Sequence, residues 1–210
     1  MSVNLSEIIL PRRVVPQPSP KVVEGGDCGA CVIAGLLGVG IAEAYDLQDR
    51  DERPEGAKDK PRPFSWQGMA HALACWGREP MTDGVLDAVP VWPWEVHEMQ
   101  THWGMVGWQQ NMAWWNYVRM GLMGGFYGVT HVNMDGKGPS FEHDHWVLIC
   151  GARQRLEPHP TMKGCGTYLQ EILVSCSARH PEGKWYDSRT YLFTHGGFNA
   201  IMVRPKGGAA

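Results

Sequence analysis

The chain has 210 residues, of which 43% are hydrophobic and 20% charged, and its formal net charge is -3. These values are typical of a globular protein, and they exclude a disordered chain and the basic surface that a nucleic-acid partner needs. Neither a secretory signal nor an apolar run of about 18 residues is visible, so we expect a cytoplasmic protein without membrane insertion. Its six cysteines are then expected to be reduced thiols.

The first part of the chain predicts an extended arm followed by a buried helix. Prolines and glycines recur through residues 1–26, which favours an extended N-terminal arm. Apolar residues then recur at helical spacing over residues 31–45, and Asp27 is a candidate N-cap. Glycines within this helix indicate that neighbouring backbone approaches it closely, and they are Gly35, Gly38 and Gly40.

The middle of the chain predicts a surface loop and two more helices. Residues 47–63 are charged and contain proline, which indicates a solvated loop. Helical patterns follow over residues 65–76 and 108–122. Tryptophan is concentrated in residues 91–117, where it is expected to fill the core; the alternative is a face that binds a protein partner.

The last part of the chain has the pattern of strands. We predict strands at Phe126–Val132, His145–Ala152, Glu171–Ser177, Tyr191–Phe193 and Asn199–Arg204. Helices followed by strands indicate an α+β architecture and not a parallel βαβ fold. We therefore predict a single domain over residues 27–205, with a helical layer packed on an antiparallel sheet, and a flexible tail at 206–210.

Two cysteines and a histidine form the candidate catalytic site. Cys28 and Cys31 stand at the start of the first predicted helix, where backbone N–H groups and the helix dipole favour an anion. A thiolate there would be nucleophilic at neutral pH if a base were nearby. His145, at the start of a predicted strand, is the candidate base, because such Cys/His pairs are adjacent in space and not in sequence.

Two segments around these residues carry a resemblance to a known family. DCGACVIAGLLG resembles the motif of the bacteriocin-leader-processing (double-glycine) peptidases, and HWVLICG resembles the strand that carries the base in the papain-like cysteine peptidase superfamily. The first alignment nominates Cys28 as the nucleophile, whereas the papain motif Cys-Gly-Ser-Cys-Trp-Ala nominates Cys31. Over residues 22–204 the resemblance implies a papain-like fold and hydrolysis of an amide or acyl bond in a peptide or small substrate, with no cofactor.

The chain departs from this family at two positions. The third catalytic group, normally Asn or Asp on the next strand, falls among Ser175, Cys176 and Ser177. The family also has a Gln several residues before the nucleophile, whereas Gln17 lies much further upstream. An alternative is therefore a catalytically impaired papain-like fold that acts as a structural or binding protein.

Two other functions use the same cysteines. Cys28 and Cys31 have the spacing of zinc ligands and would be joined by His143 and His145. The same Cys-x-x-Cys is also the motif of dithiol oxidoreductases, but these place a good strand directly before it. Here only the short segment Lys21–Gly26 precedes the motif.

Overall fold

A computed structural model describes residues 3–17, 27–46, 69, 73, 86–91, 108–134, 145–195 and 200–205. The strands within these ranges are β1 (Val3–Ile9), β2 (Leu86–Val91), β3 (Tyr127–Val132), β4 (His145–Pro158), β5 (Gly166–Cys176), β6 (His180–Asp187) and β7 (Ala200–Pro205). The helices are α1 (Cys28–Leu37), α2 (Ile41–Asp46), α5 (Trp108–Met123) and α6 (Ser188–His195). None of these helices is long and apolar enough to cross a membrane.

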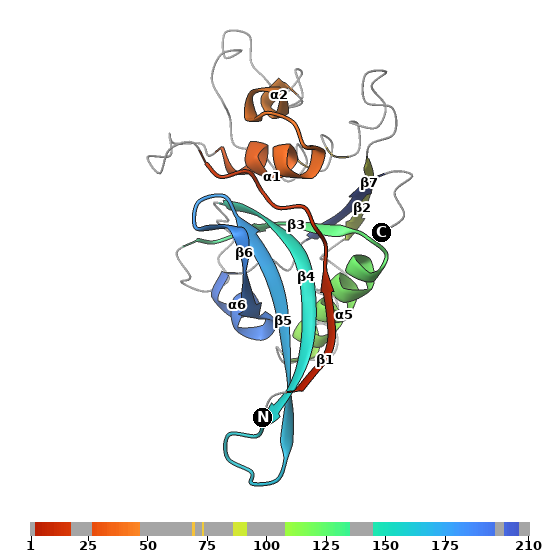
Figure 1. The fold of residues 1–210 in the computed structure, drawn as a ribbon, viewed down its shortest axis with the longest axis vertical. Coiled ribbons are helices and arrows are strands. Elements are labelled where there is room, and N and C mark those ends of the chain that lie inside the picture. Colours follow the sequence, from red (N-terminus) through yellow and green to blue (C-terminus); the bar gives the residue numbers. More distant parts are fainter. Residues whose placement is uncertain are drawn as a thin grey trace, which may run out of the picture.

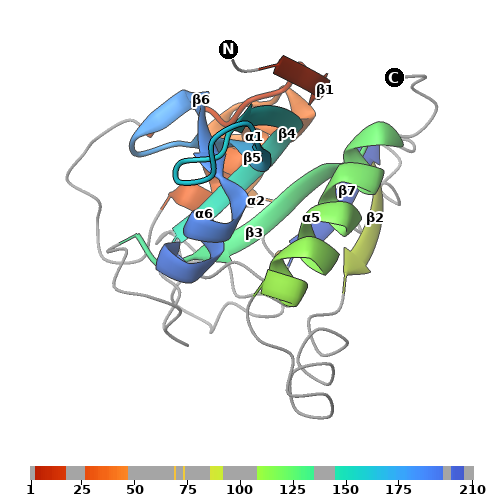
Figure 2. The ribbon, with the colours of Figure 1, turned by 90° about the horizontal axis from the view of Figure 1, so that it is seen from below.

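The strands form one antiparallel sheet, which confirms the predicted α+β class. Their order is β2-β7-β3-β4-β5-β6, and β1 pairs with β4 beside this path (Figure 1). Helices α5 and α6 lie on one side of the sheet (Figure 2), and α1 with α2 lies beyond the upper ends of the strands, next to the start of β4 (Figure 1). Helices therefore cover one side and one end of the sheet, and β3, the first half of β4 and the second half of β5 are largely buried.

The N-terminal segment crosses from the sheet to α1. The predicted extended arm begins as β1, and Leu10 then donates its backbone N–H to Cys150 at 2.8 Å. The backbone N–H of Val14 reaches Ser175 Oγ at 3.0 Å, and that of Val15 reaches the carbonyl oxygen of Cys31 at 3.1 Å. Residues 10–17, called the crossing segment below, thus bind both the sheet and α1.

The predicted helix over residues 31–45 is two helices. The first starts three residues earlier, at Cys28, and ends at Leu37, because Gly38 adopts a left-handed conformation (φ 74°) that terminates α1. Glycine suits that position since it lacks a Cβ. The close approach expected at the glycines occurs at Gly35, where an added Cβ would lie 2.8 Å from Val14 Cα and closer still to the Arg13 carbonyl oxygen.

Most other predicted elements inside the described ranges are confirmed. The helix over 108–122 is α5, and the strands at Phe126–Val132, His145–Ala152, Glu171–Ser177 and Asn199–Arg204 correspond to β3, β4, β5 and β7. The loop 47–63, the tail 206–210 and nearly all of the helix 65–76 lie outside the described residues, although Met69 and Leu73 are helical and buried.

One predicted strand is wrong, and three observed strands lack a predicted counterpart, since β1 was expected only as part of the extended arm. Residues 191–193 belong to α6, whose start is held by Asp187, because Oδ1 accepts the backbone N–H of Thr190 at 2.7 Å. This local cap outweighs the strand preference of the aromatic residues there. The sequence pattern also missed β2 and β6; β6 carries polar residues on a half-exposed edge and lacks a buried alternation.

Within the Trp-rich region 91–117, the structure describes the side chains of two tryptophans, and both lie in the core. Trp114 and Trp115 of α5 are buried, as is Trp146 of β4, which stacks on His131 with ring centroids 4.5 Å apart. These two α5 residues act as core fillers, as expected. Most of residues 91–117 lies outside the described ranges, so the protein-partner hypothesis stays a prediction.

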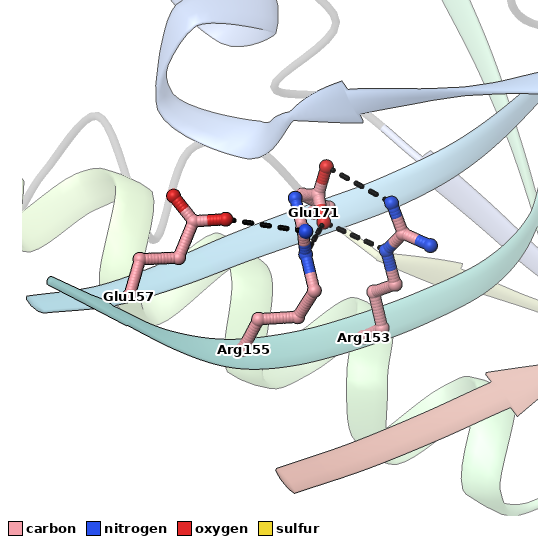
Figure 3. A network of polar contacts seen from close by, with 4 residues as sticks. All are labelled: Arg153, Arg155, Glu157 and Glu171. Atoms are coloured by element: carbon pink, nitrogen blue, oxygen red, sulfur yellow. Dashed lines mark hydrogen bonds and ion pairs between the residues drawn. The ribbon is translucent and has the colours of Figure 1, made fainter. Parts of the chain in front are cut away.

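The β4–β5 hairpin extends beyond the other strands and carries a charged network (Figure 3). Glu171 accepts hydrogen bonds from Arg153 and Arg155, each at 2.7 Å, and Arg155 also pairs with Glu157 at 3.1 Å. Burial raises the pKa of the Glu171 carboxyl, but the two arginines outweigh burial and lower it overall. The network therefore links the two strands of the hairpin, and Arg153 also lies over the ring of Trp185 at 4.2 Å.

The contact at Gly35 provides a test of the fold. We expect Gly35→Ala to lower the free energy of unfolding by at least about 2 kcal/mol, because the new methyl group meets backbone that moves only with the crossing segment. Gly40→Ala is the matched control, since nothing lies within 4 Å of its added Cβ. Urea unfolding of both variants measures the difference. Equal stabilities would show that α1 does not pack on the crossing segment in this way.

Candidate active site at the start of α1

Cys28 is the first residue of α1 and is 3% exposed. Its Sγ accepts the backbone N–H of Trp146 at 3.4 Å. A hydrogen bond to sulfur and the positive end of the helix dipole both favour the thiolate over the thiol. The start of α1 therefore gives Cys28 the surroundings that a nucleophilic thiol needs.

His145 is the first residue of β4, directly before the Trp146 N–H that binds Cys28, and it is 6% exposed. Its Nε2 lies 3.3 Å from the Sγ of Cys176, the last residue of β5. The two strands pair with Leu148 opposite Ser175, which places Cys176 diagonally across from His145. The structure therefore brings Cys28, His145 and Cys176 to one end of the sheet.

The two serines beside Cys176 have different surroundings. Ser175 is fully buried; its Oγ accepts the Val14 N–H and donates to the Pro181 carbonyl oxygen at 2.5 Å. That hydroxyl is committed to holding the crossing segment and the turn after β5. Ser177 is 4% exposed and lies beside Cys31, and its Oγ makes no hydrogen bond among the described residues. Of the three candidates for the third group, Cys176 is the one in contact with His145.

Cys31 lies one turn into α1 and has no exposed surface. Burial, followed by the charges of Asp27 and Cys28, raises its pKa from 9.0 to about 12. The neighbouring Ser177 hydroxyl lowers the pKa slightly, without the geometry of a hydrogen bond. Cys31 is consequently a protonated thiol at neutral pH, in surroundings opposite to those of Cys28.

Asp27 occupies the predicted N-cap position of α1, but its side chain makes no capping hydrogen bond. Its Oδ1 instead accepts the hydroxyl of Tyr45 in α2. Burial and this hydrogen bond raise the pKa of Tyr45, which keeps the phenol protonated. The carboxylate is thus fixed beside the cysteines, where its negative charge opposes ionisation of Cys31.

Gln17 lies beside Ser177, a neighbour that sequence spacing did not indicate. Its backbone N–H donates to the Ser177 carbonyl oxygen at 3.2 Å, and its Oε1 is buried without a hydrogen bond among the described residues. The crossing segment brings Gln17 to the end of β5 although eleven positions separate it from Cys28 in the sequence. The indication in the sequence was the Gln that papain-like peptidases carry several residues before the nucleophile. Gln17 lies further than that from Cys28, so the spacing did not identify it.

The described residues test only part of the zinc-site and dithiol-oxidoreductase hypotheses. Among the described residues there is no group of three or more His, Cys, Asp or Glu side chains able to hold a metal ion, and His143 lies outside those ranges. The cysteines described with their side chains are free thiols: Cys28, Cys31, Cys150, Cys165 and Cys176. The segment Lys21–Gly26, on which the oxidoreductase comparison depends, is outside the described residues.

No protein-family model and no curated protein matches this chain. Its function is therefore inferred from the side chains gathered at the start of α1.

The raised pKa of Cys31 predicts how stability changes with pH. Above pH 9.0 the unfolded chain loses the Cys31 proton while the folded chain keeps it, so the free energy of unfolding falls as pH rises from 9.0 towards 12. At one unit above pH 9.0 this loss is about 1 kcal/mol. Urea unfolding on both sides of that pH measures it.

Cys31→Ala should reduce this alkaline loss, while Cys165→Ala, at an exposed position, should leave it unchanged. A residual slope is expected in Cys31→Ala, because burial also raises the pKa of Cys150 to about 11. An unchanged slope in Cys31→Ala would contradict the burial of a protonated Cys31.

Proposed function

We propose that this protein is a thiol hydrolase of papain-like fold that acts on an amide or acyl bond, with Cys28 as nucleophile and His145 as base. The observation that carries the proposal is the arrangement at the start of β4: Trp146 binds the Cys28 sulfur, and the preceding residue, His145, contacts Cys176 through Nε2. A thiol, an imidazole and a third polar group in this order are the components of nucleophilic catalysis by cysteine.

The arrangement of elements supports the papain-like assignment. A buried helix starts with the candidate nucleophile and lies against an antiparallel sheet, and the candidate base begins a central strand of that sheet. The third group is on the neighbouring strand, β5. The same order, with the same roles, is what the sequence resemblance implies.

The surroundings of the two cysteines favour Cys28 as nucleophile. Cys28 starts the helix and accepts a hydrogen bond at sulfur, whereas Cys31 is fully buried, lies near the Asp27 carboxylate and stays protonated. Thiolate formation is required for attack, so Cys31 is a poor nucleophile at neutral pH. The register of the double-glycine peptidases is therefore preferred over that of papain.

The mechanism gives each group one role. His145, whose Nε2 lies 3.3 Å from the Cys176 sulfur, takes the thiol proton from Cys28 and later donates it to the leaving group. Cys28 attacks the carbonyl carbon, and the first-turn N–H of Gly29 stabilises the negative oxygen. Water then attacks the acyl-thioester carbonyl carbon, expels the thiol and releases the acid.

The third group limits the expected rate. A thiol accepts and donates hydrogen bonds more weakly than the carboxylate or amide found at this position in the family. Cys176 therefore orients His145 but stabilises the imidazolium poorly. Cys28 and His145 are also almost fully buried, which favours a small substrate or an extended chain over a bulky one. We infer a slow hydrolase.

The reactive thiol can be identified by brief iodoacetamide labelling across pH, followed by peptide mass spectrometry. We expect Cys28 to be labelled at pH values below about 8.5, the ordinary thiol pKa, because its thiolate is stabilised. His145→Ala should abolish this low-pH labelling, and Cys28→Ser should abolish turnover of an acyl or amide substrate. Exposed Cys165 is the internal control for ordinary reactivity.

The competing function is a catalytically impaired scaffold that binds a partner. The near-complete burial of Cys28 and His145 is the observation in its favour. If Cys28 reacts no faster than Cys165 at any pH and His145→Ala changes nothing, the scaffold function is supported and the hydrolase proposal fails.

A second experiment changes the group on His145. Cys176→Asn supplies an amide of similar size, and we expect it to raise kcat/KM by about 2- to 10-fold, the value of one better hydrogen bond. Cys176→Ala should lower it by a similar factor. The control is Cys150→Ala, a buried cysteine of β4 that donates to the Leu173 carbonyl oxygen at 3.5 Å and does not touch His145. Equal effects of the two alanine variants would remove Cys176 from the site.

A further inference from the structure

Two thiols of opposite character stand in the first turn of α1. Cys28 and Cys31 are three positions apart in a regular helix, which places their Cα atoms about 5 Å apart. A disulfide spans Cα separations of about 4.4 to 6.8 Å, so the pair is close enough to be bridged. The residues between them, Gly29 and Ala30, have no side chain large enough to obstruct a small change of the first turn.

The surroundings of the two sulfurs assign them different roles. The Cys28 sulfur accepts the Trp146 N–H at 3.4 Å at the positive end of the helix and is the one to react with an oxidant. Cys31 has no exposed surface and faces Ser177 and the crossing segment, through the bond from Val15 N–H to its carbonyl oxygen. Of these two buried sulfurs, Cys28 is therefore the one assigned to react first.

We propose that Cys28 and Cys31 form a reversible disulfide when the protein meets a hydroperoxide, and that this bond protects Cys28 from irreversible oxidation. This inference goes beyond hydrolysis, because it needs a reactive thiol at Cys28 but no turnover of an amide or ester.

The reaction balances in two steps. The Cys28 thiolate attacks one oxygen of hydrogen peroxide, the O–O bond breaks, and the released hydroxide takes a proton to give water and a sulfenic acid. The Cys31 sulfur then attacks the Cys28 sulfur, the S–O bond breaks, and the hydroxide leaves as water with the Cys31 proton. The two thiols lose two electrons in total, and the peroxide gains two.

Cys176 is the competing partner for an oxidised Cys28. Its Sγ is 3.3 Å from Nε2 of His145, so the imidazole already engages it, and it belongs to a different strand. Cys31 belongs to the same helical turn as Cys28 and needs no movement between elements. We therefore expect the bond to join Cys28 to Cys31 and not to Cys176.

The test treats the full chain with limiting hydrogen peroxide, blocks remaining thiols with N-ethylmaleimide and maps the peptides. In the wild type we expect the peptide that contains both cysteines to lose two hydrogen atoms, to escape the blocking reagent and to be restored by dithiothreitol. Exposed Cys165 should remain available to the reagent and serves as the control. Cys176→Ser should keep the disulfide.

Cys31→Ser should lose the disulfide and should instead accumulate a sulfenic acid at Cys28, trapped by dimedone, and then a sulfinic acid that dithiothreitol does not reverse. Cys31→Ala repeats this measurement with a different side chain, and circular dichroism confirms that both variants fold. A bond from Cys28 to Cys176, or sulfinic acid at Cys28 in the wild type at the same rate as in Cys31→Ser, would overturn the proposal.

These outcomes separate the two proposals. A disulfide in a protein that hydrolyses nothing would support the redox inference and leave the hydrolase proposal without support. If the untreated protein hydrolyses a substrate, and peroxide then oxidises its Cys28 irreversibly although Cys31 is present, the hydrolase is supported and the protection is overturned.

Discussion

The hydrogen bonds of the crossing segment hold the start of α1 in register with the end of the sheet. Val15 binds the Cys31 carbonyl oxygen, and Gln17 binds that of Ser177, so one stretch of backbone is joined to the helix and to β5. Apolar burial alone is not directional and would leave α1 able to slide or turn on the sheet. These bonds fix the height and rotation of the helix, and the contact between Cys28 and Trp146 depends on both. The site is consequently assembled by a segment that supplies none of its proposed reacting atoms.

The composition of α1 follows from that constraint. A helix that is covered by the crossing segment as well as by the sheet has to be apolar on nearly every side, and eight of its residues are buried. There is also no room for a side chain where the segment passes the helix, which explains the glycine at residue 35 although glycine weakens helices. The helix therefore depends on tertiary packing for its stability, and local opening of the crossing segment would loosen the first turn and expose Cys28 and Cys31 together.

Sequence patterns predicted the elements of the buried sheet well, because β3, β4, β5 and β7 are apolar runs whose burial is strong. They did not distinguish among Ser175, Cys176 and Ser177, since successive residues point to opposite faces and the choice depends on the pairing of β4 with β5. The irregularity in that pairing between Ile149 and Gly151, and the one between Val174 and Cys176 in the pairing of β5 with β6, cannot be read from one strand alone. The aromatic residues of α6 also favour strands, so the sequence pattern does not distinguish this helix from a strand. The approach of Gln17 to Ser177 depends on the path of the crossing segment over α1, which sequence spacing does not give.

The electrostatics of the site connect its two proposed chemistries. Asp27 is fixed by Tyr45, and together with burial its charge keeps Cys31 a thiol. Both proposals therefore assign the reacting thiolate to Cys28, and a thiolate attacks a carbonyl carbon or a peroxide oxygen. The Asn or Asp of papain-like peptidases would strengthen the imidazolium, whereas in the proposed site Cys176 gives weaker support and leaves more of the thiolate's stabilisation to the helix and the Trp146 N–H. A thiolate stabilised mainly by backbone dipoles does not require a charged histidine. Such a thiolate reacts with an oxidant even when no substrate is bound. A neighbouring protonated cysteine is then an advantage, because it does not compete for the negative charge at rest and yet lies within one helical turn of the oxidised sulfur.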